Sequence, residues 1–228
     1  MRKLALVTGA SGGIGRSVAE KLDTLGYDLV LTCYKNPDGL KGLPGRHFSG
    51  DIGDPAFVRE LFGGLGRLEL LVNNAGISHA GLLQDMTDDE WRRLFATNLD
   101  AVFYTCREAI PLMLGKGGRI INISSVWGRR GASMEVAYSA SKGALEAFTR
   151  ALAKELAPSR IAVNAVSPGA VDTDMNRNLT AQELESLKEE IPFGRFAVPE
   201  EIAEAVAMLA SAPEYLTGEI IGINGGWY

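Results

Sequence analysis

A short apolar run that leads through a glycine-rich turn into an amphipathic helix constrains the fold most. Residues 3–8 have the composition of a buried strand, residues 9–15 are rich in glycine, and the helical pattern after them ends near Leu25, where Gly26 suits a C-terminal cap. Glycines let the backbone approach a pyrophosphate, and a helix N-terminus supplies free N–H groups. This order predicts a phosphate-binding turn, although its spacing, Gly9-x-x-x-Gly13-x-Gly15, differs from G-x-G-x-x-G. A tight turn without a ligand is the alternative.

Short apolar runs alternate with helical patterns along the rest of the chain. We expect further strands at residues 28–34, 47–51, 68–72, 119–125, 161–166 and 219–224. We expect helices at residues 55–62, 88–114, 138–156, 181–190 and 200–209. Such alternation is typical of a parallel sheet covered by helices on both faces. The sequence therefore predicts an α/β fold, a single doubly wound Rossmann-type domain over residues 1–228 with a seven-stranded parallel sheet.

Composition argues against several classes of function. The chain has 228 residues, 46% of them apolar, which allows a large core, and its net charge of −5 without a basic block argues against a nucleic-acid partner. No apolar run reaches membrane-spanning length, and residues 4–7 run directly into the glycine-rich turn, so we expect a core strand there and no signal peptide. Cys33 and Cys106 have no pairing pattern, which indicates reduced thiols of a cytoplasmic protein. His47 and His79 are isolated, so we expect no metal site.

A tyrosine and a lysine lie four residues apart in the segment Tyr-Ser-Ala-Ser-Lys. Tyr138 and Lys142 therefore share one face of the predicted helix. A nearby cation favours the phenolate, so we expect Lys142 to lower the pKa of Tyr138 from its usual value near ~10. A proton donor tuned toward neutral pH suits carbonyl reduction. For this pair alone, two side chains on a solvated helix face are the alternative.

Polar and small residues gather where the predicted strands end. Asp51 ends the third strand, Asn-Asn-Ala-Gly at residues 73–76 follows the fourth, and Ser125 ends the fifth. Ligands in parallel sheets bind beyond these carboxyl ends. Asn98 lies in the middle of a predicted helix, where asparagine has poor helix propensity, which indicates a specific role for this side chain; a tolerated asparagine is the alternative. Residues 170–195 are polar with one predicted helix and are a candidate lid.

The end of the second strand bears on the choice of cofactor. An acid there would bind the ribose 2′-hydroxyl of NAD, whereas a cation would accommodate the 2′-phosphate of NADP. The strand ends in Tyr34 and Lys35 without an acid, which favours NADP(H); Asp38, a little further along, leaves NAD(H) open. An ordinary exposed lysine is the alternative for Lys35. Residues 36–46 can hold at most one helical turn, so this crossover is short.

Together these features resemble the short-chain dehydrogenase/reductase family over essentially the whole chain. The resemblance is carried by Thr-Gly-Ala-Ser-Gly-Gly-Ile-Gly at residues 8–15, Asp51, residues 73–76, Asn98, Ser125, Tyr138-x-x-x-Lys142 and Pro168-Gly169. Within the family, residues 168–175 and 217–226 are most similar to 3-oxoacyl-[acyl-carrier-protein] reductases. Three features depart from the family pattern: the crossover after Lys35 is short, the helix near Phe57 is short, and Gly12 stands where many NADP-dependent relatives carry arginine.

The resemblance implies four catalytic residues. Tyr138 would protonate the carbonyl oxygen during reduction. Lys142 would lower the pKa of Tyr138 and hold the ribose of the nicotinamide half. Ser125 would hydrogen-bond the substrate oxygen, and Asn98 would anchor a water that links Lys142 to bulk solvent.

The resemblance also implies an NAD(P) site along the strand ends. The pyrophosphate and nearby ribose would be surrounded by Gly9, Ser11, Gly13, Ile14 and Gly15. Asp51 and Ile52 would flank the adenine, and Asn74 and Ala75 would line the adenosine side. The nicotinamide and its carboxamide would be held by Pro168, Gly169, Val171 and Thr173. The expected cofactor-binding residues also include Tyr34, Lys35, Gly76, Tyr138 and Lys142.

The implied activity is that of an NADP(H)-dependent oxidoreductase that reduces a carbonyl, in the first place a 3-oxoacyl thioester of fatty-acid synthesis, to a hydroxyl by hydride transfer. One alternative is an NAD(P)-dependent dehydrogenase of a small ketone, alcohol or sugar; another is a non-catalytic nucleotide-sensing module. An acyl carrier protein is acidic, so Arg129 and Arg130, between Ser125 and Tyr138, are candidates to attract an anionic substrate handle, with solvated loop arginines as the alternative. The family's usual assembly is a homotetramer.

Overall fold

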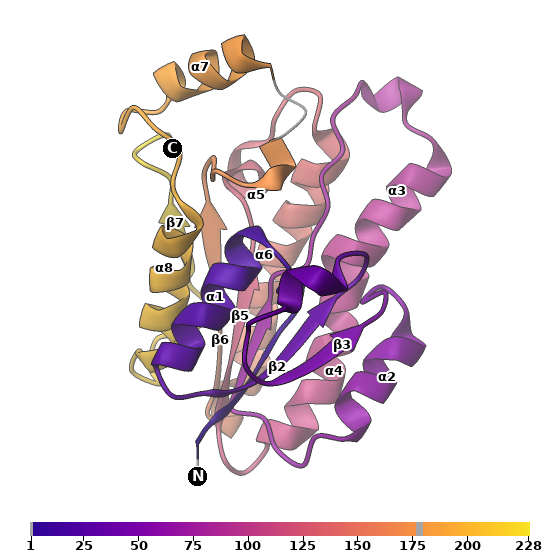
Figure 1. Cartoon of the computed structure of the whole chain (residues 1–228), viewed down its shortest axis with the longest axis vertical. Coiled ribbons are helices and arrows are strands. Elements are labelled where there is room, and N and C mark those ends of the chain that lie inside the picture. The colour runs from indigo at the N-terminus through magenta and orange to yellow at the C-terminus, as the bar shows by residue number, and fades with distance from the viewer. Residues whose placement is uncertain (1, 177–179) are drawn as a thin grey trace.

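The computed structural model, which describes residues 2–176 and 180–228, confirms the predicted α/β architecture. Its seven strands form one sheet in the order β3-β2-β1-β4-β5-β6-β7, and every neighbouring pair is parallel (Figure 1). The strands are β1 (Leu4–Val7), β2 (Asp28–Cys33), β3 (Arg46–Ser49), β4 (Leu70–Asn73), β5 (Gly118–Ile123), β6 (Ile161–Pro168) and β7 (Ile220–Ile223). The strand order reverses between β1 and β4, and this is the point at which such sheets bind ligands.

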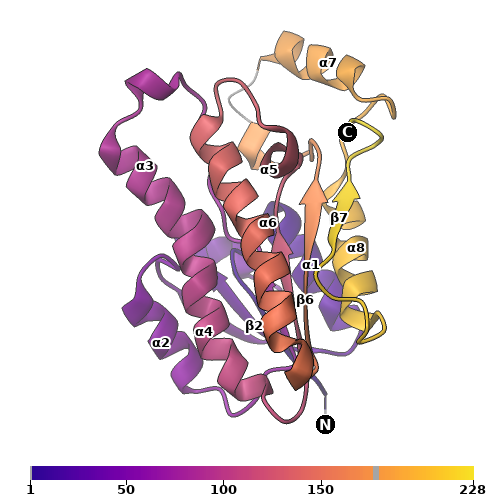
Figure 2. The ribbon, with the colours of Figure 1, turned by 180° about the vertical axis from the view of Figure 1, so that it is seen from behind.

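Helices cover both faces of the sheet. On one face α1 (Gly13–Thr24) packs against α8 (Pro199–Ser211), and on the other α2 (Pro55–Gly63), α4 (Ala101–Met113) and α6 (Val136–Leu156) lie over the strands (Figures 1 and 2). Successive strand side chains point to opposite faces. Accordingly, Ala5 and Val7 of β1 belong to one hydrophobic cluster and Leu4 and Leu6 to the other.

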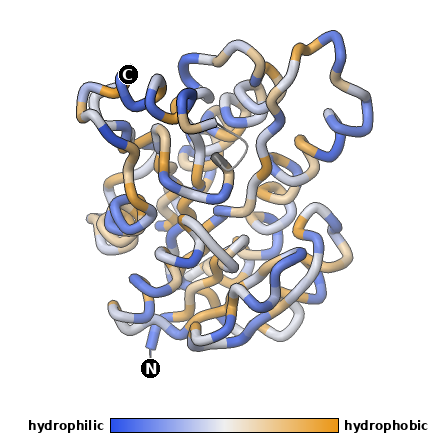
Figure 3. Tube along the Cα trace, turned by 45° about the horizontal axis from the view of Figure 1, so that its top comes forward, coloured by the Kyte–Doolittle hydropathy of each residue, from blue (hydrophilic) through white to orange (hydrophobic). Residues whose placement is uncertain are grey.

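Shorter elements lie mostly around the carboxyl ends of the strands. They are α3 (Asp88–Phe95), α5 (Val126–Arg130), α7 (Ala181–Glu190) and the single turns η1 (Pro37–Leu40), η2 (Leu83–Asp85), η4 (Ala157–Ser159) and η5 (Asp174–Asn176). The short crossover after β2 folds into η1, as predicted. The predicted lid, residues 170–195, includes residues 177–179, which lie outside the described part of the chain; its helix α7 is confirmed and is mostly hydrophilic (Figure 3).

Two local features differ from the sequence-based expectation. The segment between Ser125 and Tyr138, expected to be a loop, contains α5, which is too short to show a helical period in the sequence. The helix expected at residues 88–114 is interrupted by a π-helical turn, η3 (Ala96–Asp100), between α3 and α4. Single π-turns inside helices occur frequently at functional sites.

A chain of buried polar side chains crosses the interior from α4 to α6. The Thr105 hydroxyl donates to Asn73 Oδ1 at 2.7 Å, Asn73 Nδ2 donates to Asn122 Oδ1 at 2.9 Å, and Asn122 Nδ2 donates to Thr149 Oγ1 at 2.9 Å. All four residues are buried. Among the described residues, no buried side-chain nitrogen or oxygen lacks a hydrogen-bond partner. This chain fixes α4 and α6 relative to β4 and β5.

The glycine-rich turn is tied to the end of β4 by side-chain hydrogen bonds. Thr8 Oγ1 accepts the backbone N–H groups of Asn74 and Ala75, both at 3.0 Å. Asn74 Nδ2 donates to the carbonyl oxygens of Thr8 and Gly9, both at 3.0 Å. A Cβ on Gly15 would overlap the Gly9 carbonyl and the Asn74 amide. The turn therefore requires glycine at position 15, where the helix passes closest to it.

We predict that Gly15→Ala destabilises the protein by about 1–3 kcal/mol, because the added methyl has no room. Gly12→Ala is the matched control in the same turn, since a Cβ there meets no atom within 4 Å and the φ of 178° suits any residue. Urea unfolding measures both free energies. Equal stability of the two variants would contradict this packing argument.

Candidate active site

The four predicted catalytic residues lie close together beyond the carboxyl ends of β4 and β5. Ser125 caps the N-terminus of α5, Tyr138 and Lys142 lie one turn apart on α6, and Asn98 lies in η3. Their exposed fractions are 8%, 8%, 4% and 1% in that order. A lysine is rarely so deeply buried in a folded protein, which points to a specific role for this one.

Lys142 is held beside the ring of Tyr138 by a backbone carbonyl. Its Nζ donates to the oxygen of Ile123 at 2.8 Å and lies 5.7 Å from the centroid of the Tyr138 ring. A Cβ on Gly76 would lie 3.5 Å from Nζ and 3.4 Å from Asn98 Oδ1, so Gly76 brings the end of β4 against both groups. Burial lowers the pKa of Lys142 to about 8.

The pKa of Tyr138 does not follow the sequence-based expectation. We expected Lys142 to lower it, but burial raises the pKa of Tyr138 to about 12, and the Glu135 carboxylate also raises it. Hydrogen bonding to Ser125 acts in the opposite direction. The expectation was wrong because spacing along a helix reports proximity but not desolvation, which here dominates. The phenol therefore keeps its proton throughout the neutral range.

Asn98 has a structural reason to lie inside a helix. Its Oδ1 accepts the N–H of Ile77 at 2.9 Å, and its Nδ2 donates to the carbonyl of Ile77 at 2.9 Å and to Ser141 Oγ at 3.1 Å. The side chain thus ties η3 both to the segment after β4 and to α6. Water anchoring by Asn98 stays a prediction; the contacts in the structure assign it a positioning role.

The N-terminus of α1 fits a pyrophosphate. No side chain caps this helix, whereas Asp54 caps α2 and Thr87 caps α3. The surrounding turn presents backbone and glycine surface, and a Cβ on Gly13 would lie 3.1 Å from Thr173 Cγ2. Free N–H groups at a helix N-terminus bind phosphate. The residues present therefore suit the phosphate groups of a dinucleotide.

The remaining residues of the predicted cofactor site border the same edge of the sheet. The Gly-rich turn lies against Ala75, since a Cβ on Gly9 would be 2.9 Å from the Ala75 Cα; the Ser11 carbonyl lies against Gly39 of η1. Ile14 packs partly into the core, and Ile52 is buried in it.

On the predicted adenosine side, Tyr34 is exposed and Asp51 Oδ1 accepts the N–H of Gly53 at 2.9 Å. On the predicted nicotinamide side, Pro168 ends β6, and the Gly169 N–H donates to the Ile223 carbonyl at 2.9 Å. Val171 pairs with Ala197 in an isolated bridge. The structure thus brings the ends of β1, β4 and β6 together, and Lys35 and Asp51 lie at the β2 and β3 edge of the same site.

An aromatic cluster that was not predicted from the sequence lies beside Ser125. The ring centroids of Trp127 on α5 and Trp227 lie 4.9 Å apart, and Tyr228 lies 5.5 Å from Trp127. The guanidinium of Arg130 lies 5.3 Å from the Tyr228 ring. The only sequence signal is the Trp-Tyr pair at residues 227 and 228, which does not indicate its partner. Trp127 also packs against the buried cluster that contains Tyr138, so the aromatic rings and Arg130 lie beside the candidate site.

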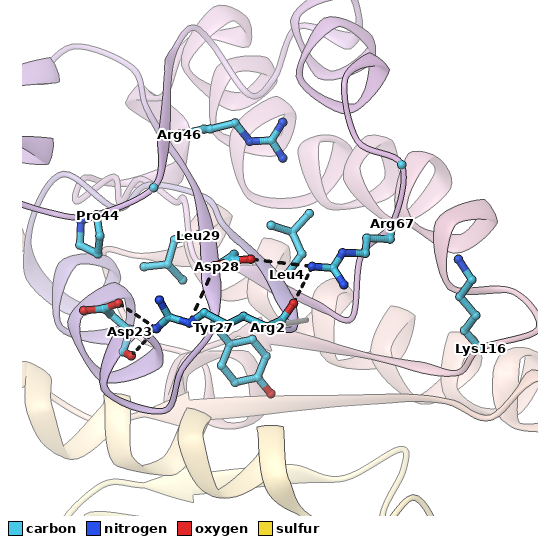
Figure 4. Close-up of a pocket in the computed structure, with 12 residues that line it drawn as sticks. Arg2, Leu4, Asp23, Tyr27, Asp28, Leu29, Pro44, Arg46, Arg67 and Lys116 are labelled. Atoms are coloured by element: carbon cyan, nitrogen blue, oxygen red, sulfur yellow. Dashed lines mark hydrogen bonds and ion pairs between the residues drawn. The ribbon is translucent and has the colours of Figure 1, made fainter.

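A cavity of about 670 Å³ lies at the opposite end of the strands from the candidate site, and none of the predicted site residues lines it. It is bordered by the amino ends of the strands, and its charges largely pair with one another (Figure 4). Arg2 lies 3.5 Å from Asp23, and Arg67 lies 3.7 Å from Asp28. Within the described residues, no group of three or more His, Cys, Asp or Glu could hold a metal ion, and no helix is both long and apolar enough to cross a membrane.

Comparisons with known proteins agree with this arrangement. A family model described as Enoyl-(Acyl carrier protein) reductase matches residues 9–228. The 3-oxoacyl-[acyl-carrier-protein] reductase FabG of Salmonella typhimurium is 40% identical, over 99% of this chain and 97% of its own.

Two solved structures are similar over nearly their whole length. One, titled short-chain dehydrogenase/reductase SDR:Glucose/ribitol dehydrogenase, from Brucella melitensis, has a TM-score of 0.92 and 35% identity, and the match covers 100% of this chain and 96% of that one. The other, a blue fluorescent protein from a metagenomic library in complex with NADPH, has a TM-score of 0.91 and 36% identity, and the match covers 99% and 97%. The chain is therefore a member of the short-chain dehydrogenase/reductase family, an oxidoreductase that acts on a carbonyl or CH–OH group with NAD(P).

Proposed function

We propose that this enzyme reduces the ketone of a 3-oxoacyl thioester to a 3-hydroxyacyl thioester, with NADPH as reductant. The observation that carries the proposal is the meeting of Ser125, Tyr138 and Lys142 in a buried site next to the uncapped N-terminus of α1. The choice of substrate is supported by FabG, whose name gives this activity. The choice of NADPH is supported by Lys35 and by the solved relative in complex with NADPH.

When bound, NADPH would supply the hydride for the ketone carbon. The hydroxyls of Ser125 and Tyr138 hydrogen-bond the ketone oxygen, which fixes the carbonyl and stabilises the negative charge that develops on it. Tyr138 then transfers its proton to that oxygen, which completes the alcohol. The ammonium of Lys142 stabilises the phenolate left behind, and it also holds the nearby ribose. Asn98 fixes the segment after β4 relative to α6, which carries Lys142, through its hydrogen bonds to Ile77 and Ser141.

Two other oxidoreductase activities appear in the names of similar proteins, and the experiment should distinguish them from ketone reduction. The Brucella neighbour is titled glucose/ribitol dehydrogenase, and the family model is described as an enoyl reductase. NADPH and NADH oxidation should be compared with acetoacetyl and crotonyl thioesters and with simple ketones and sugars. Turnover of the acetoacetyl thioester with NADPH in preference to the others supports the proposal, and turnover of another class alone rejects it. A non-catalytic nucleotide-sensing module would bind the cofactor without any turnover.

We further propose that the enzyme works as a homotetramer in the cytoplasm. The outer surfaces of α4 and α6 carry apolar residues, among them Phe103, which is exposed on α4, and the half-buried Phe148. Burial of such a face against a second copy would remove apolar surface from water. The two cysteines are free and buried, which suits a reducing compartment.

Tyr138→Phe should lower kcat for ketone reduction by roughly 10²–10⁴-fold, because the proton donor is lost. NADPH binding should persist, since the ring remains in place. Tyr215→Phe is the matched control because its side chain is 99% exposed. Retention of full activity by Tyr138→Phe, followed by the loss of NADPH absorbance, would remove Tyr138 from the mechanism.

As the pH rises, the rate of ketone reduction should fall when Lys142 loses its proton, well before Tyr138 does. Reduction needs Lys142 charged, which holds below its pKa of about 8, and Tyr138 protonated, which holds below about 12. Rising pH therefore removes the ammonium first, so kcat/KM should fall as the pH passes through about 8. Lys142→Arg should move this decline to higher pH because a guanidinium stays charged. A kcat/KM that stays constant up to about pH 10 would contradict the need for a charged Lys142.

Arg129→Ala/Arg130→Ala should lower kcat/KM by roughly tenfold for a thioester with an anionic phosphopantetheine handle. Both arginines are exposed at the C-terminal end of α5, the short helix that Ser125 caps. A neutral ketone should be reduced at the parent rate. Arg160→Ala, which removes a cation paired with Glu214 before β6, is the charge control. If both substrates respond equally, the two arginines do not recognise the handle.

A further inference from the structure

Two cations from distant parts of the sequence flank one exposed aromatic ring at the end of β2. Lys35 Nζ lies 5.4 Å from the centroid of the Tyr34 ring, and the Arg93 guanidinium carbon lies 5.9 Å from it. Lys35 directly follows Tyr34, whereas Arg93 belongs to α3. Tyr34 is 47% exposed, and Lys35 and Arg93 are exposed as well.

The end of α3 lies against the adenosine side of the cofactor site. A Cβ on Gly53 would lie 3.4 Å from the Ala96 carbonyl oxygen, just beyond α3, and 3.2 Å from Asp51 Oδ1. The Ser49 hydroxyl donates to the Tyr34 carbonyl at 3.3 Å and joins the ends of β2 and β3. Arg93 therefore extends from α3 toward the place where the second strand of such folds meets the adenosine ribose.

Neither cation has an acidic partner. Within residues 2–176 and 180–228, Lys35 and Arg93 form no ion pair, whereas the neighbouring Arg92 lies 3.2 Å from Asp88 and 3.1 Å from Asp89. Asp38, three residues after Lys35, pairs with Lys41 at 2.7 Å, and Asp51 Oδ1 accepts the Gly53 N–H. Two unpaired positive charges at one exposed spot favour a doubly charged anion.

The glycine-rich turn provides no cation of its own. Position 12 is glycine, and nothing lies within 4 Å of where its Cβ would be. We propose that Arg93, together with Lys35, binds the 2′-phosphate of the adenosine ribose of NADPH and so selects NADPH over NADH. This inference rests on the proposed use of NADPH and assigns to α3, an element outside the predicted cofactor residues, a part in cofactor choice.

Direct binding measurements on the whole protein test this assignment without turnover. Dissociation constants for NADPH, NADH, adenosine 2′,5′-bisphosphate and 5′-AMP should be measured for the parent, Arg93→Ala and Lys35→Ala. Each variant should bind NADPH and the bisphosphate roughly tenfold or more weakly, because a charge-assisted contact to the phosphate is lost. NADH and 5′-AMP should bind as to the parent, which also shows that the variants are folded. Added salt should weaken NADPH binding to the parent more than to Arg93→Ala.

Arg92→Ala is the matched control, because it removes a cation from the same helix that is already paired with Asp88 and Asp89. It should leave all four dissociation constants unchanged. Equal loss of NADPH and NADH affinity in Arg93→Ala, or unchanged NADPH affinity, overturns the assignment while the proposed reduction can still be observed in the parent. If the parent binds neither dinucleotide, the proposed function and this inference fall together.

Discussion

Four hydrogen bonds between the ends of β1 and β4 hold the site together. Thr8 receives two backbone N–H groups from Asn74 and Ala75, and the Asn74 amide returns two bonds to the carbonyls of Thr8 and Gly9. Because β1 leads into the glycine-rich turn and β4 leads to Gly76 beside Lys142, these four bonds set the distance between the turn proposed to bind phosphate and the proposed catalytic residues. An error of about 1 Å in such a distance can cost on the order of 10²-fold in rate.

Burial sets the pKa values of Tyr138 and Lys142, the proposed reacting pair. The same desolvation raises the pKa of Tyr138 and lowers that of Lys142, so a neutral phenol and an amine that titrates near neutrality lie side by side. In a parallel sheet closed by helices on both faces, side chains at the strand ends are only partly open to water. The fold thus provides both the position of Tyr138, the proposed proton donor, and the low dielectric that keeps its proton in place.

Much of this arrangement could be predicted from the sequence because it depends on local patterns. Apolar runs locate the strands, and the four-residue spacing places Tyr138 beside Lys142. The sense of the Tyr138 pKa shift could not be predicted, since it depends on how much protein surrounds the ring. Arg93 beside Tyr34 and Trp227 beside Trp127 could not be predicted either, because each contact joins segments far apart in the chain. The unfavourable position of Asn98 was visible, but its partners Ile77 and Ser141 were not.

The polar chain from Thr105 through Asn73 and Asn122 to Thr149 bears on how this sequence can evolve. Replacing any single member with an apolar residue leaves a buried partner without its hydrogen bond, which lowers the stability of the fold by about 1–3 kcal/mol. Replacing both partners together with apolar groups of similar shape can be nearly neutral. A total stability of only about 5–15 kcal/mol tolerates few such losses. Lineages that descend from this protein should therefore inherit or abandon the two asparagines as a unit.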